Sequence, residues 1–258
     1  MKNILVCVKA VPVSTSVQVD GEYRLKRDGV NLQWNIADES ALEAAISLKD
    51  TDGTVTVLTM GPSKLEAPLK ELLARGADRA VLVTDRLMAG ADTRATATAL
   101  KAAAEKLGPF DLILCGRRAI DGETGQVPGE LAAALGISCV SNAEMIRQEG
   151  NELVVSRRLE NGVQKLSVSC PAVVSLCEYS YNLRLAGILS MRRAKNKAVE
   201  DYSAADLGLV AEVCGLKGSP TKVIAMENKF PGIRNGIKEE NAETGVAGIL
   251  EMIREVRL

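Results

Sequence analysis

Short apolar runs alternate with helical patterns through the first half of the chain. The apolar runs have the length of buried strands and lie at 4–8, 55–60, 80–84 and 112–115. The helical patterns between them lie at 39–49, 64–75 and 91–107. Strands separated by helices of this length build parallel βαβ units with right-handed crossovers. The pattern therefore predicts an α/β fold with a doubly wound parallel sheet.

The second half of the chain departs from this alternation. After residue 136, strand patterns follow one another without helices at 151–159, 162–170 and 171–177. A turn at 160–162 joins the first two of them into a hairpin. The first two segments predict an antiparallel hairpin region added to the parallel sheet.

Four further features complete the expected organisation. A hairpin around Asp20 and Gly21 is predicted at 17–26, as an insertion after the first strand. A last strand is expected at 221–226 and a last helix at 243–256. The chain is expected to divide into an α/β domain at 1–185 and a docking loop with a C-terminal arm at 186–258.

Composition narrows the chemistry that the chain can perform. The 258 residues include no histidine, which excludes Ser-His-Asp and Cys-His nucleophiles, imidazole bases and His-bearing metal sites. The 32 Lys and Arg residues nearly balance the 33 Asp and Glu residues, so there is no general attraction to nucleic acid. Any reaction must therefore use a bound cofactor, carboxylates, lysines or hydroxyls.

Cysteine usage and hydropathy indicate the compartment. The six cysteines have no CxxC pair and no spacing typical of zinc or iron–sulfur sites, so no metal is expected; they lie at 7, 115, 139, 170, 177 and 214. The apolar run at the start is short for a signal peptide, and no stretch approaches the roughly 18 apolar residues of a membrane span. These features predict a cytoplasmic protein without direct membrane insertion.

The loops that follow the strands are the candidate sites, because open parallel sheets bind ligands beyond the carboxyl ends of their strands. The richest loop is 116–130, where glycines surround Asp121 and Gln126, and Thr124 and Pro128 mark the start of the next helix. Glycines allow close approach of the backbone, and amides at a helix start attract phosphate. An ordinary strand-to-helix loop capped by Thr124 explains the residues equally well.

A second candidate is the segment 89–100. Asp92 is expected to cap a helix whose first turns carry Thr93 and Thr96 on one face. Seen alone, these threonines are slightly better explained as surface residues of an alanine-rich helix. Two such helix starts side by side would suit the two phosphates of a dinucleotide, and that pairing is more specific than either part.

The third candidate is the basic stretch 182–199, which contains five Lys and Arg residues and no acid. A solvated charged surface is the ordinary explanation of such a run. Here, however, aliphatic residues interleave with the arginines, namely Leu183, Leu185, Ile188, Leu189 and Met191. This mixture favours a loop that docks on a partner protein through an aliphatic anchor inside a charged rim.

Several blocks of the sequence resemble the β subunit of electron-transfer flavoproteins. They include LVCVKAVP at 5–12, WNIADESALEAA at 34–45, RGADRAVLV at 75–83, DLILCGRRAIDGETGQVPGELA at 111–132 and RRAKNK at 192–197. The resemblance covers nearly the whole chain and implies a Rossmann-like, adenine-nucleotide-binding sheet at 1–185. It also implies an obligate α subunit that carries its own FAD.

The resemblance further implies a bound FAD of the electron-bifurcating group. A GADT-x-x-T helix start and a DG-D/E-T-x-Q-V loop distinguish that group from relay members, which hold AMP. The residues expected at the cofactor are Cys7, Lys9, Ala10, Asn35, Asp38, Met60, Gly61, Gly90, Ala91, Asp92, Thr93, Thr96, Gly116, Arg117, Ala119, Asp121, Gly122, Glu123, Thr124, Gly125, Gln126 and Val127.

The same resemblance implies the partners. NADH would be the electron donor, and the acceptors would be the α-subunit FAD, leading to an acyl-CoA or related flavin dehydrogenase, and a ferredoxin or flavodoxin. NADH oxidation would occur only in the α/β complex. Dehydrogenase docking is expected at Ile188, Leu189, Arg192 and Arg193, although this stretch and the tail depart from the family's usual residues. Two alternatives remain, a relay β subunit with structural AMP and an ATP-binding regulatory module.

Overall fold

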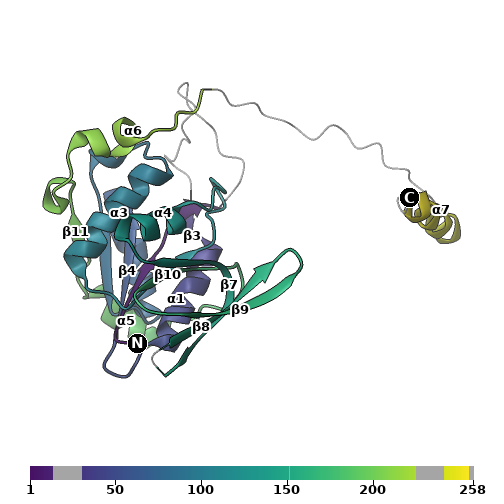
Figure 1. Ribbon diagram of the computed structural model, residues 1–258, viewed down its shortest axis with the longest axis horizontal. Helices are drawn as coiled ribbons and strands as arrows, with labels where there is room; N and C mark the ends of the chain where they lie inside the picture. The colour runs from purple at the N-terminus through teal and green to yellow at the C-terminus, as the bar shows by residue number, and fades with distance from the viewer. Residues whose placement is uncertain (14–30, 151, 225–240, 256–258) are drawn as a thin grey trace. The chain divides into compact units, whose positions relative to one another are not determined.

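The computed structural model of the chain describes residues 1–13, 31–150, 152–224 and 241–255. The chain divides into two compact units, Met1–Val223 and Ile224–Leu258. The first unit is built on a large sheet, to which the described residues contribute nine strands (Figure 1). These strands are β1 (Asn3–Cys7), β4 (Thr54–Met60), β5 (Arg79–Val83), β6 (Leu112–Gly116), β7 (Ser138–Glu149), β8 (Glu152–Leu159), β9 (Gly162–Val168), β10 (Ala172–Leu176) and β11 (Glu200–Tyr202).

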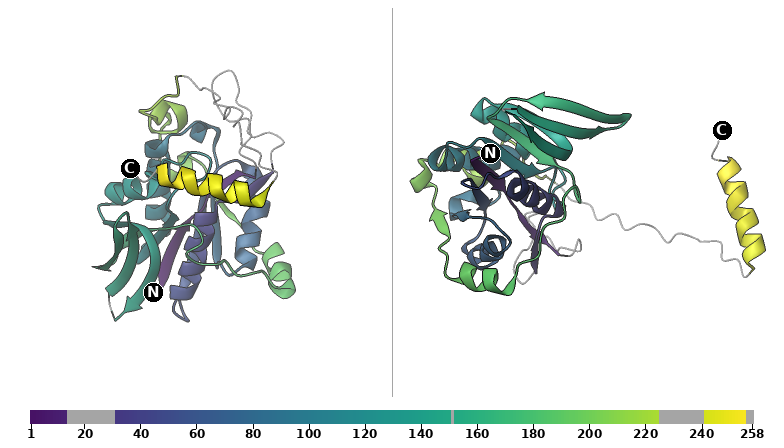
Figure 2. Two further views of the ribbon diagram at one scale, coloured as in Figure 1. Left: turned by 90° about the vertical axis from the view of Figure 1, so that its right-hand side faces the viewer. Right: turned by 90° about the horizontal axis from the view of Figure 1, so that it is seen from below.

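The order of strands in the sheet is β11-β5-β4-β1-β6-β10-β7-β8-β9. All neighbours from β11 to β7 are parallel. The pairs β7–β8 and β8–β9 are antiparallel, and the β8–β9 hairpin extends beyond the helical layers (Figure 2). A small antiparallel sheet joins β2 (Ala10–Pro12) and β3 (Leu32–Trp34). The predicted doubly wound α/β fold with an added hairpin region is confirmed.

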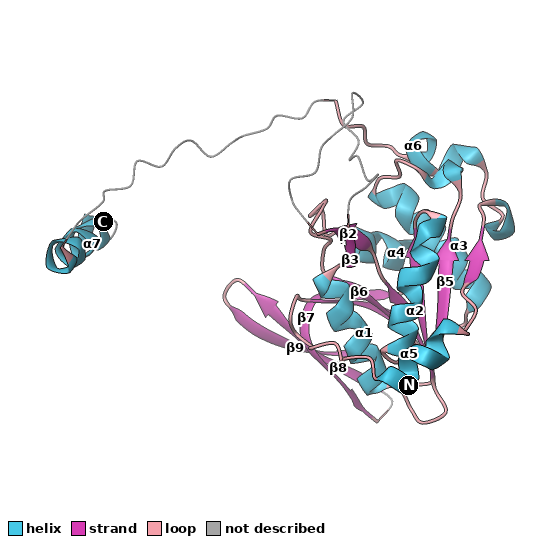
Figure 3. Cartoon of the chain, turned by 180° about the vertical axis from the view of Figure 1, so that it is seen from behind, coloured by secondary structure: helices cyan, strands magenta, loops and turns pink. Residues whose placement is uncertain are grey.

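Helices cover both faces of the parallel sheet. They are α1 (Ile36–Leu48), α2 (Glu66–Ala74), α3 (Thr93–Leu107), α4 (Val127–Leu135), α5 (Ile188–Lys195) and α6 (Gly215–Gly218), with 3₁₀ turns η1 (Ser63–Leu65), η2 (Arg86–Met88), η3 (Ala205–Leu207) and η4 (Ala211–Val213). Figure 1 shows α3 and α4 in front of the sheet, and Figure 3 shows α1, α2 and α5 on the reverse side. The second unit contains α7 (Ala242–Glu255).

The period of two along β1 explains these layers, because successive side chains of a strand point to opposite faces. Ile4 and Val6 belong to the core cluster that includes Leu42 of α1 and Leu69 of α2. Leu5 lies in the other cluster, together with Leu100 of α3, Leu131 of α4 and other residues of that face. Each strand residue therefore contributes to one of two cores, one on each side of the sheet.

The switch point of the sheet lies between β1 and β6. From β1 the chain proceeds to β4 and β5 on one side, and it then returns past β1 to form β6 and β10 on the other. Cys7 and Cys115 are register partners near the carboxyl ends of β1 and β6. Loops that leave a switch point diverge and open a crevice for ligands. The loops after β1 and β6 are thus the best-placed candidates for a site.

Several sequence predictions differ from the structure. β7 was missed because its buried residues Val140, Ala143 and Ile146 recur every third position, and a β-bulge between Ala143 and Met145 breaks the strand alternation. The docking loop expected in 182–199 contains a helix, α5. Within the strand expected at 221–226, the described residues 221–224 form no strand, and the hairpin expected at 17–26 lies outside the described residues.

The C-terminal organisation can be compared with the expected domains. The last helix, expected at 243–256, is confirmed as α7. Residues 186–223 belong to the same compact unit as the sheet, through contacts such as β11 with β5 and α5 with α2. The functional division at 185/186 stays a prediction about partner contacts. No helix among the described residues combines the length and the apolar character of a membrane span.

Candidate functional site

The first turn of α1 joins the loops that follow β1 and β6. Asp38 Oδ2 accepts a hydrogen bond from the backbone N of Lys9 at 2.8 Å, and Oδ1 accepts one from the backbone N of Gly116 at 2.9 Å. Only 6% of Asp38 is exposed. Burial raises the pKa of this carboxyl to about 7, although hydrogen bonds from Asn35, Lys9 and Gly116 oppose the rise. The Asp38 side chain therefore links the loop after β1 to the loop after β6 through their backbone amides.

Asn35, the N-cap residue of α1, holds the loop after β6 from the same side. Its Nδ2 donates to the carbonyl of Arg118 at 2.9 Å, and its Oδ1 accepts from the backbone N of Ile120 at 3.3 Å. Its backbone N donates to the carbonyl of Lys9 at 3.0 Å. Because Asn35 is fully buried, its amide is committed to shaping this loop.

Gly116 and Lys9 bring the two loops close together. A Cβ on Gly116 would lie 2.1 Å from Asp38 Oδ1 and 2.8 Å from Ala37 Cβ, so no larger residue fits. Lys9 Nζ forms an ion pair with Asp121 Oδ1 at 2.6 Å, and the Asp121 side chain is only 6% exposed. The predicted residues Lys9, Asp38, Gly116 and Asp121 are thus brought together by direct contacts.

The starts of α3 and α4 lie side by side. Thr93 Oγ1 lies 3.1 Å from Gln126 Oε1 and 3.0 Å from Glu130 Oε1. A hydroxyl has one proton, so Thr93 donates to only one of these oxygens at a time. Its hydroxyl links the two helices, and Thr96 lies one turn further along α3, partly buried.

The caps of these helices confirm one prediction and correct another. Asp92 caps α3 as expected, with its Oδ1 accepting from the backbone N of Ala95 at 3.0 Å. Thr124 does not cap α4, because the helix begins at Val127 with Gln126 as the N-cap residue and without a side-chain cap bond. The glycine at 125, with a φ of +63°, turns the chain between Thr124 and the helix.

The remaining predicted cofactor residues surround the same edge of the sheet. Cys7 lies at the end of β1, Ala10 begins β2, and Met60 and Gly61 stand at the end of β4. Gly90 and Ala91 precede the cap of α3. Ala119 and Val127 are partly buried, and most of the loop between them is exposed, namely Gly122, Glu123, Thr124, Gly125 and Gln126.

Cys115, at the end of β6, stays a thiol, because the Cys7 thiol and burial hold its pKa well above the usual range.

Glu178 is a residue of this edge that the sequence did not indicate. It follows β10, which pairs with β6, and it forms ion pairs with Arg117 at 3.1 Å and with Arg118 at 3.2 Å. Arg118 also lies 3.7 Å from Glu123. An acidic residue directly after a buried strand was the available signal, since such positions reach the ligand edge of a parallel sheet.

The expected docking residues lie at the opposite end of the sheet. Ile188 and Leu189 of α5 are 74% and 67% exposed, and Arg192 and Arg193 are exposed as well. The helix packs on α2 through the buried Ala194. Shortly after it, Lys197 Nζ donates to the carbonyl of Asp78 at 3.4 Å, just before β5 begins. The site loops, in contrast, follow the carboxyl ends of the strands.

The residues at the strand edge fit a nucleotide. Arg117 Nε and Glu130 Oε2 are buried and lack hydrogen-bond partners in the described part of the chain. A Cβ at Gly122 or Gly129 would meet nothing within 4 Å, so the backbone at the start of α4 is open to a ligand. Phosphates suit the helix starts, and ligand hydroxyls can donate to carboxylates. An open parallel sheet with a glycine-rich loop at its switch point is the arrangement typical of nucleotide-binding α/β proteins.

Comparisons with known proteins identify the family. The electron transfer flavoprotein domain matches residues 24–207. The electron transfer flavoprotein subunit beta of Thermoanaerobacterium thermosaccharolyticum is 40% identical over 254 residues, which cover 97% of each chain. The chain belongs to the electron transfer flavoprotein family, among its β subunits, and the expected family is confirmed.

Two further relatives come from other organisms. Subunit CarD of the caffeyl-CoA reductase-Etf complex of Acetobacterium woodii is 39% identical over 224 residues, which cover 86% of each chain. Protein FixA of Bradyrhizobium diazoefficiens is 40% identical over 233 residues, which cover 86% of this chain and 81% of FixA. This chain is therefore similar along most of its length to proteins from several different organisms.

Proposed function

We propose that this chain is the β subunit of a heterodimeric electron-transfer flavoprotein of the bifurcating kind, and that it binds FAD at the carboxyl edge of its sheet. The observation that carries the proposal is the contact of Thr93 with Gln126 and Glu130, which brings two helix starts together. FAD has two phosphates, and two adjacent helix starts with a hydroxyl and open backbone amides suit it.

Each part of the site has a different task in this proposal. The amides at the start of α4 and the loop 122–126 hold phosphate, and the start of α3 provides hydroxyl groups nearby. Asn35 and Asp38 keep the two loops in place from within the fold. Arg117 and Arg118, held by Glu178, supply positive charge beside the anionic ligand.

FAD held at this edge would supply the redox chemistry, namely two-electron reduction by NADH and single-electron transfer toward the FAD of the α subunit and toward a low-potential ferredoxin or flavodoxin. The chain itself brings no histidine for proton transfer, and its Cys115 stays protonated. Its residues therefore bind, orient and shield the cofactor, while the chemistry belongs to the cofactor.

The proposed partners are an α subunit and a flavin dehydrogenase for acyl-CoA or a related substrate. The names of relatives support this, since one is a subunit of a caffeyl-CoA reductase-Etf complex and another is the acryloyl-CoA reductase electron transfer subunit gamma of Anaerotignum propionicum, 40% identical over 231 residues. We place dehydrogenase docking on α5, where Ile188 and Leu189 form an exposed aliphatic pair beside Arg192 and Arg193.

One observation favours a second candidate, the relay β subunit with structural AMP. The start of α4 has no side-chain cap bond, so its free backbone amides suit a single phosphate without any contribution from α3. FAD and AMP would share this strand edge and differ in how far they extend along it.

Electron bifurcation is tested in the complex with its α subunit and dehydrogenase. With NADH as the only reductant, we expect ferredoxin reduction only while the dehydrogenase's high-potential substrate is also present. One ferredoxin electron should appear for each electron delivered to that substrate, because a hydride carries two. Substrate reduction at an undiminished rate without ferredoxin or another low-potential acceptor would support the relay function instead.

A further inference from the structure

The carboxylate of Asp92 serves two separate parts of the chain. Its Oδ1 caps α3 by accepting from the backbone N of Ala95 at 3.0 Å. Its Oδ2 accepts from Thr221 twice, from the backbone N at 3.0 Å and from Oγ1 at 2.8 Å. Thr221 lies 129 residues further along the chain. The cap of the nucleotide-site helix is therefore also the anchor of a distant segment.

The segment that Asp92 anchors is tightly docked on the loop before α3. The backbone N of Asp92 donates to Ser219 Oγ at 2.8 Å, and the backbone N of Leu216 donates to the carbonyl of Ala89 at 3.0 Å. Ser219 is 6% exposed, and its hydroxyl donates to the carbonyl of Gly215 at 2.7 Å. A Cβ on Gly215 would lie 2.1 Å from the carbonyl O of Leu87, so the two backbones are in close contact.

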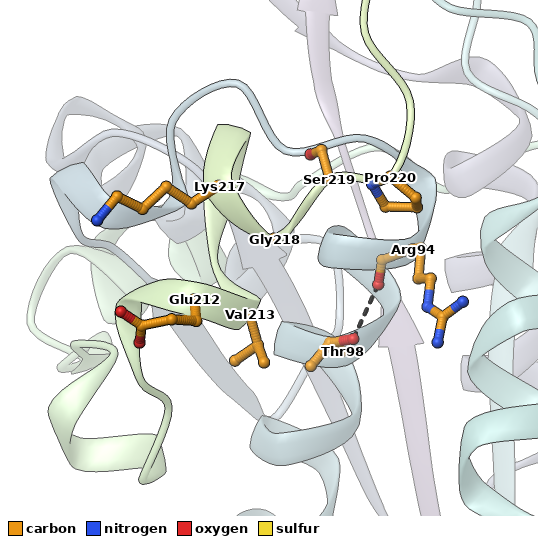
Figure 4. Close-up of a pocket in the computed structure, with 8 residues that line it drawn as sticks. All are labelled: Arg94, Thr98, Glu212, Val213, Lys217, Gly218, Ser219 and Pro220. Carbon is orange, nitrogen blue, oxygen red and sulfur yellow. Dashed lines mark hydrogen bonds between the residues drawn. The ribbon is translucent and has the colours of Figure 1, made fainter.

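The docked segment lies beside the first turns of α3. Figure 4 shows Ser219 and Pro220 next to the helix that carries Arg94 and Thr98. Arg94 and Thr98 of α3 line a pocket of about 370 Å³ together with residues 212–213 and 217–220. Beyond Thr221 the first compact unit ends at Val223, and the chain continues into the second unit, Ile224–Leu258. Thr221 is thus one of the last anchored residues before the second unit.

The charge on Asp92 suits this double role. Partial burial raises its pKa, but hydrogen bonds from Ala95 and Thr221 outweigh burial and hold the pKa below the usual range. A carboxylate accepts several hydrogen bonds at once, and bonds to a charged acceptor are stronger than neutral ones. Asp92 is therefore an ionised acceptor that both segments share.

We infer that Asp92 is a positioning residue that couples nucleotide binding at the start of α3 to the anchoring of residues 219–221. This inference rests on the proposed nucleotide site. A ligand that contacts the first turn of α3 stabilises that turn, and the ordered turn fixes the carboxylate that holds Thr221. When the turn frays, the cap bond to Ala95 and the bonds to Thr221 are lost together.

The coupling acts in both directions, because the linkage of two binding equilibria is reciprocal. Nucleotide binding tightens the anchored segment, and loss of the anchor weakens nucleotide binding. The chain that leads to the second unit is consequently held more firmly when the nucleotide is present.

The amide hydrogen of Thr221 reports the anchor directly, because its backbone N donates to Asp92. The experiment compares hydrogen exchange at Thr221 in the α/β complex loaded with FAD and in the complex stripped of nucleotide at the β site. We expect removal of the nucleotide to accelerate exchange at Thr221 at least about fivefold. Equal exchange rates in the two states would overturn the inference.

Two variants test the reverse direction. Asp92→Ser retains a good helix cap but lacks the second oxygen that reaches Thr221, and Thr221→Val removes one bond outside the ligand loops. We expect each to raise the dissociation constant for FAD at the β site at least about threefold, because each lost bond involves a charged acceptor. Unchanged FAD affinity in both variants would contradict the coupling.

A matched control is available in the same unit. Ser203 donates to Asp206 Oδ2 through its backbone N at 2.9 Å and through Oγ at 2.6 Å, which repeats the arrangement of Thr221 and Asp92. Ser203→Ala is therefore expected to leave FAD affinity and Thr221 exchange unchanged. If the β chain binds FAD but hydrogen exchange at Thr221 does not change, only the coupling is contradicted. If the β chain binds no nucleotide, the proposed function is contradicted as well.

Discussion

At the scale of single residues, Asp38 fixes the position of the loop after β1 relative to the loop after β6. Its two oxygens bind backbone amides that lie 29 and 78 residues away in the chain. Contacts between residues so far apart leave no local pattern in the sequence, so these contacts could not be predicted from the residues alone. Only the family resemblance placed Asp38 at the site. The close approach of Gly116 follows from the same carboxylate, because its Cβ position is occupied by Asp38 Oδ1.

Asp38 is expected to make stability depend on pH. Its folded pKa of about 7 exceeds the ordinary value of 3.8, so between these pH values the folded state binds more protons than the unfolded state. The free energy of unfolding therefore falls as the pH rises from 4 to 7, by up to about 1.4 kcal/mol per pH unit from this group. Asp38→Asn removes this slope, which denaturant unfolding of both proteins across that range would measure.

The same variant has a second, pH-independent effect. The amide that replaces one oxygen faces a backbone N–H, and one donor is left unpaired at a cost of about 1–3 kcal/mol. Asp201→Asn, at an exposed residue of β11, serves as the control for the loss of a carboxylate. If the difference in the free energy of unfolding between wild type and Asp38→Asn stayed constant from pH 4 to 7, burial would not raise the pKa of Asp38.

The hydroxyls at the start of α3 are expected to support the β-site flavin. Replacing Thr93 and Thr96 together by valine preserves side-chain shape but removes the link from Thr93 to Gln126 and Glu130. The dissociation constant for FAD at the β chain should rise about thirtyfold, at roughly 1 kcal/mol for each of the two lost hydroxyls, while the α-subunit FAD is retained. Flavin content after gel filtration and an equilibrium titration would show this.

The control for the threonine pair lies on the same helix. Thr98 Oγ1 donates to the carbonyl of Arg94 within α3 at 2.9 Å, so Thr98→Val removes a hydroxyl without affecting the contact with α4. If the double variant retained FAD as well as Thr98→Val does, the hydroxyls of Thr93 and Thr96 would have no part in binding.

At the scale of elements, strong periodicity made the strands and helices of the first half predictable. The predicted runs at 4–8, 55–60 and 112–115 match β1, β4 and β6 to within one residue at each end. The helix at 188–195 was harder to predict from the sequence. It packs mainly through the small residue Ala194 and exposes its large aliphatic residues, so its sequence has no helical stripe of apolar residues facing the core.

The aliphatic pair on α5 is expected to dock the dehydrogenase. Ile188→Ala combined with Leu189→Ala removes apolar area that the β chain leaves exposed, so folding and flavin content should not change. Loss of one or two aliphatic anchors costs about 2–4 kcal/mol at an interface centre, which corresponds to a dissociation constant raised about thirtyfold or more. Titration of the dehydrogenase with the α/β complex measures this constant.

The control for this surface uses Val163→Ala on β9, where another aliphatic side chain is 64% exposed. That variant should bind the dehydrogenase as tightly as wild type. Docking that is equally strong in the α5 double variant would exclude Ile188 and Leu189 as anchors.

At the scale of the whole molecule, the near-neutral charge conceals a local asymmetry. The stretch 182–199 has five basic residues and no acid, but Arg184 is bound to Glu43, with its Nη2 at 2.7 Å from Oε1. The arginines of α5, at the amino end of the sheet, remain exposed beside the aliphatic pair. The proposed nucleotide edge and the proposed docking helix therefore lie at opposite ends of the first unit, which would let each meet a different partner.

The most direct test of the central claim is to release and count the nucleotides of the purified α/β complex. We expect two FAD per heterodimer, and a lower FAD content at the β chain when Thr93→Val with Thr96→Val weakens the site. One FAD with one AMP per heterodimer would contradict FAD binding by this chain and support the relay function. ATP without flavin would contradict the proposed function altogether.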